Sequence, residues 1–167
     1  TVKRDFYTAP ELHPAFGGVL AREIVKRLQV LRSRGVPGPY TVVEMGSGEG
    51  MLARQVIESI TKHHPEEAQS MRFVLVERCR GQLLDTVVSL SALCPRVLGY
   101  SRIEDILPCS GVFYSNELVD SFPVHLLQKE EDKVKEVYVD EAGSMTPGEL
   151  STADLRRHAH ALVGQPT

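Results

Sequence analysis

The sequence predicts an α/β fold built on an open parallel sheet, and three observations support this. Residues 41–45 and 72–77 are short apolar runs of the kind that form buried strands. Each run is followed by a segment with apolar residues at helical spacing, at 51–60 and 80–93. A glycine-rich turn joins the first strand to its helix. Strands that alternate with helices pair in parallel, because each helix carries the chain back across the sheet.

The other elements follow from the same patterns. We expect residues 4–14 to form an ordered loop, in which Thr8 caps the next helix, and residues 63–67 to be a break. The remaining elements, in order, are a helix at 14–34, strands at 95–100 and 111–115, hairpin strands at 124–128 and 134–139, and a helix at 151–162 capped by Ser151 or Thr152.

The composition is that of one globular domain. The 167 residues are 42% hydrophobic and 25% charged, and the net charge of −3 argues against nucleic-acid binding through charge. Cys79, Cys94 and Cys109 form no CxxC pair, so we expect reduced thiols in a cytosol-like compartment and no zinc site. No apolar run reaches the roughly 18 residues that a membrane span needs, and no signal-peptide pattern follows Thr1.

The spacing of the glycines limits which ligand the turn can bind. No Lys-Ser or Lys-Thr pair follows the glycines, so a P-loop is disfavoured, and Met51 stands where the dinucleotide fingerprint needs its last glycine. Glu44 lies two residues before Gly46-x-Gly48-x-Gly50, which resembles the first motif of class I S-adenosylmethionine (SAM) methyltransferases. A carboxylate suits this cofactor, which carries an ammonium and a sulfonium and no pyrophosphate. A glycine turn without a ligand is the alternative.

Further polar residues follow the other predicted strands. Glu77 ends the second strand, where a carboxylate can accept hydrogen bonds from both ribose hydroxyls, or simply face solvent. Asp105 or Glu104 can accept from an adenine amino group, although an exposed turn or occupation of this position by Arg102 is equally consistent. Adjacent histidines at 63 and 64 point apart, so we expect them to face solvent and bind no metal.

The fourth strand, 111–115, runs into a polar segment that we expect to carry the chemistry. Asn116, Glu117 and Asp120 lie at the carboxyl end of a central strand, beside the glycine turn in the inferred sheet. For Asp120, a helix cap and a catalytic role are both open.

Four segments together resemble the MidA family of SAM-dependent methyltransferases, which includes a mitochondrial complex I assembly factor that modifies an arginine. The segments are 5–11 with 16–17, 43–50, 76–77 and 115–124. The resemblance implies a Rossmann-like class I methyltransferase fold, SAM as methyl donor, and a protein side chain such as arginine as acceptor. It implies cofactor binding by Thr8, Glu44, Gly46, Gly48, Gly50, Glu77, Asp105 and Asn116, and catalysis by Glu117 and Asp120.

The same resemblance sets the expected extent of the fold. We predict a single SAM-binding domain over 1–167, with an N-terminal loop and helix at 1–35, a cofactor-binding core at 40–123, a hairpin at 124–140 and a helix at 151–163. Four sheet strands and a hairpin are fewer than the seven strands of the class I fold. We therefore expect an N-terminal portion or a shortened paralogue, whose unpaired sheet edge favours self-association.

Two other functions remain open. A nicotinamide-dependent oxidoreductase would share the fold and Glu77, but the position of the third glycine argues against it. A non-catalytic assembly module that retains the methyltransferase fold is favoured by the short chain. We expect the compartment to be the cytoplasm, or the mitochondrial matrix in a eukaryote, and we expect no membrane partner.

Overall fold

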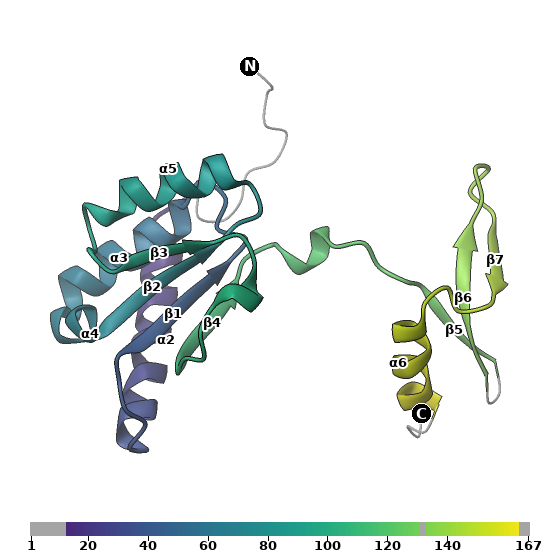
Figure 1. The fold of residues 1–167 in the computed structure, drawn as a ribbon, viewed down its shortest axis with the longest axis horizontal. Helices are drawn as coiled ribbons and strands as arrows, with labels where there is room; N and C mark the ends of the chain where they lie inside the picture. Colours follow the sequence, from purple (N-terminus) through teal and green to yellow (C-terminus); the bar gives the residue numbers. More distant parts are fainter. Residues whose placement is uncertain (1–12, 131–132, 164–167) are drawn as a thin grey trace. The chain divides into compact units, whose positions relative to one another are not determined.

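The computed structural model describes residues 13–130 and 133–163, and it divides the chain into two compact units (Figure 1). The first unit runs to Ser121 and the second begins at Phe122. This boundary lies next to the predicted limit of the cofactor-binding core at 123. Whether both units act as the predicted single domain stays a prediction. No helix within the described ranges combines the length and apolar character of a membrane span.

The first unit is built on a four-stranded parallel sheet in the order β3-β2-β1-β4. Its strands are β1 Tyr40–Met45, β2 Met71–Val76, β3 Val97–Tyr100 and β4 Gly111–Ser115. In the register, Glu44 of β1 lies between Leu75 of β2 and Tyr114 of β4. The predicted parallel α/β arrangement is confirmed, and the glycine turn follows an inner strand.

Among the described residues of this unit, four helices accompany the sheet: α2 Ala15–Ser33, α3 Met51–His63, α4 Pro65–Ser70 and α5 Arg80–Ser91. Buried apolar residues of α2, α3 and α5 form one core with Val42, Phe73 and Leu75, which alternate along their strands and therefore share a face. On the opposite face, Val43, Val74 and Val76 form a smaller buried cluster. Burial on both faces explains why β1 and β2 are almost continuously apolar.

The break predicted at 63–67 is limited to His64, between α3 and α4, because residues 65–70 form the short helix α4, which was not predicted. Proline is compatible with a helix at its first position, where its missing N–H leaves no bond unmade. Glu67 is only 7% exposed, accepts a hydrogen bond from Gln29 at 3.1 Å and lies 3.8 Å from Arg32, both on α2. These distant partners stabilise a helix that its own sequence does not indicate.

The second unit is a three-stranded antiparallel sheet with one helix. Its elements are β5 Leu127–Glu130, β6 Lys133–Val139, β7 Met145–Gly148 and α6 Ala153–Val163, and the strand order is β5-β6-β7. The predicted hairpin is present, although its first strand begins later, and β7 was not predicted because it contains Pro147 and Gly148. Thr152 is the cap of α6, since its Oγ1 accepts the N–H of Leu155 at 3.0 Å.

Candidate functional site

The glycine turn has a backbone that glycine alone adopts without strain. Gly46, Gly48 and Gly50 have φ values of 68°, 52° and 74°, in the left-handed region. The N–H groups of Gly46 and Ser47 both donate to the Val76 carbonyl, at 2.8 and 3.3 Å. The turn is thereby held against the carboxyl end of β2, and α3 begins directly after it.

Two neighbouring elements pack closely on this turn. A Cβ on Gly46 would lie 2.6 Å from Leu118 Cδ1, and one on Gly50 would overlap the Thr86 methyl group of α5. Around Gly48, in contrast, no atom of the described residues other than its two chain neighbours lies within 4 Å of such a Cβ. The turn is therefore enclosed at both ends and open at its centre.

Glu77 connects the turn to the segment that follows β2. Its Oε2 accepts the Gly48 N–H at 3.1 Å, and its Oε1 accepts the Cys79 N–H at 3.0 Å. Each carboxylate oxygen has a second lone pair, so the group can accept further hydrogen bonds. The structure thus brings together two of the predicted cofactor residues, Gly48 and Glu77.

Glu44 is nearly inaccessible, at 3% exposure, and its Oε2 accepts the Tyr114 hydroxyl at 2.8 Å. Burial raises the pKa of Glu44 to about 7, because desolvation disfavours the ionised carboxylate, while the hydrogen bond from Tyr114 acts in the opposite direction. Burial, together with the nearby Glu44, holds the pKa of Tyr114 well above its usual value. The sequence analysis missed Tyr114, because it lies 70 residues from Glu44 and only the pairing of β1 with β4 brings the two together.

The segment after β4 forms a tight turn. Glu117 has φ 48°, which is unusual for a residue other than glycine, and its side chain is exposed. The Leu118 carbonyl accepts both the N–H and the hydroxyl of Ser121, at 3.1 and 2.6 Å. Asn116 is partly buried, and the Asp120 side chain is exposed on the 3₁₀ turn Val119–Ser121. Glu117 therefore directly precedes Leu118, the residue that packs against Gly46.

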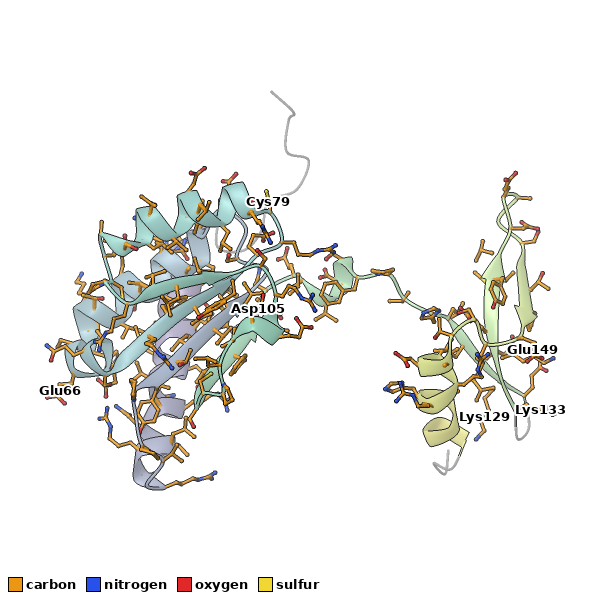
Figure 2. The ribbon with its side chains drawn as sticks, in the orientation of Figure 1. Glu66, Cys79, Asp105, Lys129, Lys133 and Glu149 are labelled. Carbon is orange, nitrogen blue, oxygen red and sulfur yellow. The ribbon has the colours of Figure 1, made fainter. Side chains whose placement is uncertain are left out.

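The remaining predicted site residues are Asp105, which is exposed, and Thr8. Asp105 is exposed on the 3₁₀ turn Ile103–Asp105 after β3 (Figure 2). Arg102 Nε lies 3.4 Å from Glu104 Oε2. Arg102 thus pairs with Glu104. Thr8 lies outside the described residues.

A hollow of about 580 Å³ opens between the turn and α5, and it contains no predicted site residue. It is lined by Glu49, Gly81, Gln82, Asp85, Thr86 and Ser89. Polar residues at helical spacing on α5 were the signal for it. Among the described residues, no three His, Cys, Asp or Glu side chains are grouped so as to hold a metal ion.

Comparison with known families shows the family to which the chain belongs. Residues 19–163 match the model of a family described as "putative S-adenosyl-L-methionine-dependent methyltransferase". The chain belongs to this family. The family match confirms the predicted class and its cofactor, SAM.

Related proteins and structures agree with this family. The chain is 29% identical over 158 residues to a mitochondrial protein arginine methyltransferase NDUFAF7 homolog of Drosophila melanogaster, covering 84% of this chain and 36% of that protein. It is 28% identical over 153 residues to the Caenorhabditis elegans homolog, covering 82% and 35%. The chain spans little more than a third of these relatives.

A solved structure is similar over almost the whole chain. It is a COG1565 superfamily member from Burkholderia thailandensis bound to S-adenosyl-homocysteine, with 29% identity and a TM-score of 0.60, and the match covers 96% of this chain and 40% of that one. Together these findings confirm the MidA-type family and the Rossmann-like fold class of the sequence analysis. The roles of individual residues stay predictions.

Proposed function

We propose that the chain binds SAM as part of a methyltransferase whose acceptor is a protein side chain such as arginine. The observation that carries the proposal is the contact of Glu77 with the Gly48 N–H, which joins to the glycine turn a carboxylate that we expect to bind the ribose. The family match and the S-adenosyl-homocysteine bound to the similar Burkholderia structure support the same cofactor.

The residues of the turn fit this cofactor. Gly48 leaves open space where another residue would carry a side chain, and Glu77 retains acceptor capacity for two ribose hydroxyls. Within the described part of the chain, the buried Ser47 hydroxyl has no hydrogen-bond partner, so a polar ligand group would satisfy it. Glu44 would hold the methionine end, Asp105 the adenine, and Asn116 a polar group near the methyl.

The chemistry depends mainly on positioning. SAM supplies an already activated methyl group, and transfer requires the acceptor nitrogen to be held in line with it. Glu117 and Asp120 are exposed carboxylates after β4, and charge-assisted hydrogen bonds from a guanidinium suit them. One of them would accept the proton that the nitrogen loses. The left-handed backbone of Glu117 supports this role, because such strain often occurs at functional residues.

The proposed methyl acceptor and compartment are inferred from the names of the relatives. Arginine is proposed because the Drosophila and Caenorhabditis relatives are named protein arginine methyltransferases, and a mitochondrial compartment because they are named mitochondrial. The absence of nucleic-acid and membrane partners, and self-association through the sheet edge, stay predictions.

Calorimetric titration of the chain with S-adenosyl-homocysteine tests the cofactor proposal. We expect saturable binding, at least tenfold weaker binding for Glu77→Ala, and unchanged binding for Glu66→Ala, which alters an exposed carboxylate on α4. NADH serves as the competing ligand. Binding of NADH without S-adenosyl-homocysteine would favour an oxidoreductase, and binding of neither would favour an assembly module.

A further inference from the structure

The buried carboxyl of Glu44, two residues before the glycine turn, pairs with the partly buried phenol of Tyr114. They are register partners on the neighbouring strands β1 and β4, so their side chains share the face that carries α2 and α3. Tyr114 donates to Glu44 Oε2 at 2.8 Å, and its ring meets Phe73 edge-on at a centroid distance of 6.4 Å. The tyrosine is therefore held by packing as well as by its hydroxyl.

The surroundings of this pair are apolar. On β2 the register partner of Glu44 is Leu75, and Tyr114 on β4 is the titratable group that contacts it. At the turn, the nearby carboxylate Glu77 is already engaged by backbone N–H groups. The buried residues of α2 and α3 are all glycine, alanine, valine, leucine or isoleucine, so none of them carries a charge.

Glu44 consequently has one neutral donor and no cationic partner among the described residues. A buried ionised carboxylate without a counter-charge is unfavourable, so the group holds a proton up to a higher pH than an exposed glutamate. A cation brought next to it would favour ionisation. The α-ammonium of SAM or S-adenosyl-homocysteine is such a cation and stays charged below about pH 7.7.

We infer that Tyr114 is a positioning residue of the cofactor site, whose hydroxyl holds Glu44 ready for the ammonium of the cofactor, and that binding expels a proton from Glu44. This inference rests on the proposed function. Tyr114 occupies Oε2 and leaves Oε1 to accept from the ammonium. The expelled proton passes to the buffer, and the carboxylate that remains pairs with the cofactor.

The test is calorimetric titration with S-adenosyl-homocysteine at pH 6 and pH 7, each in two buffers that differ in ionisation enthalpy. We expect release of about 0.9 proton at pH 6 and about 0.5 at pH 7. Because Glu44 must ionise before it can pair, we also expect binding to be about fivefold tighter at pH 7 than at pH 6.

Variants show which residue releases the proton and what the Tyr114 hydroxyl does. Glu44→Gln should abolish proton release over this range. Tyr114→Phe removes the hydrogen bond that favours the ionised carboxylate, so the midpoint of the pH profile should move upward. Tyr40→Phe is the matched control: it removes a buried hydroxyl that donates to the Val36 carbonyl in the same core, and it should leave the midpoint unchanged.

The outcomes separate this inference from the proposed function. Binding whose enthalpy at pH 6 is the same in both buffers, or proton release that persists in Glu44→Gln, overturns the inference and leaves the cofactor proposal standing. If Tyr114→Phe weakens binding equally at every pH and leaves the midpoint of the pH profile at its wild-type value, Tyr114 has a purely structural role. That result would also overturn the inference. No binding by the wild type at any pH overturns both.

Discussion

Glu77 Oε2 accepts the backbone N–H of Gly48 at 3.1 Å, and Glu77 Oε1 accepts that of Cys79 at 3.0 Å. One side chain thus links the glycine turn to the start of α5. The contact joins residues 29 positions apart in the sequence at the carboxyl edge of the sheet, where ligands of open α/β folds bind. Several consequences of this construction can be measured.

Gly46→Ala should destabilise the first unit by about 2–4 kcal/mol, because a left-handed backbone and a clash with Leu118 act together. Gly48→Ala is the matched control, since it has the same handedness and open space around the new Cβ, and it should cost about 1–2 kcal/mol. Chemical denaturation measures both. If Leu118→Ala does not recover part of the Gly46→Ala loss, the steric part of this explanation is wrong.

Glu44→Gln should change how stability depends on pH. The pKa of Glu44 in the folded chain is about 7, above its usual 4.5, so its contribution is greatest below pH 4.5 and is lost as pH rises to 7. Relative to the wild type, the variant should gain about 3 kcal/mol between pH 4.5 and pH 7. Thermal unfolding across this range measures the difference, and a constant difference would contradict the assignment.

Glu67→Ala should lower the free energy of unfolding of the first unit by about 1–2 kcal/mol, since Gln29 loses its acceptor and Arg32 its counter-charge. Hydrogen exchange should accelerate in α4 before other helices do. Glu66→Ala, on the exposed face of α4, should change stability by less than about 0.5 kcal/mol. Equal effects of the two substitutions would show that Glu67 does not anchor the helix.

Glu136→Ala should destabilise the second unit. Glu136 is 6% exposed and accepts from the Ser151 N–H at 2.7 Å, lies 2.6 Å from His125 Nδ1, and is 3.3 Å from the Tyr138 hydroxyl. The variant leaves the Ser151 N–H and the His125 ring without this acceptor, whereas the Tyr138 hydroxyl still donates to the Glu149 carbonyl at 2.6 Å. The near-ultraviolet circular dichroism of Tyr138, the tyrosine of this unit, measures the effect. Glu141→Ala removes an exposed carboxylate beyond β6, so it is the control and should leave the stability of the second unit unchanged.

Glu136 also predicts how the stability of the second unit depends on pH, and the sign is opposite to that predicted for Glu44. Hydrogen bonds from His125 and Ser151 lower the pKa of Glu136 to about 2. Its contribution to the second unit is therefore complete above pH 4.5 and is lost as the pH falls towards 2. Acid titration of the wild type and of Glu136→Gln, followed by the signal of Tyr138, should show that the difference in stability of the second unit disappears at low pH.

Much of the first unit was predictable because its signals are local. The β-branched run of β1, the glycine spacing after it and the apolar run of β2 each report their own structure within ten residues. Parallel pairing then brings the ends of β1 and β2 together, so the proximity of Glu77 to the glycine turn also followed. Helix α4 and strand β7 were missed, because partners elsewhere in the fold stabilise them against a weak local signal.

The sequence alone determined the fold class, the glycine turn, the family and the position of its polar residues along the chain. Only the tertiary structure decided which of these residues meet and in what protonation state. Tyr114 reaches Glu44 across 70 residues, and the burial that raises the pKa of that carboxyl comes from helices on one face of the sheet. Periodicity reports how one segment folds, whereas desolvation and hydrogen bonding depend on every segment packed around a group.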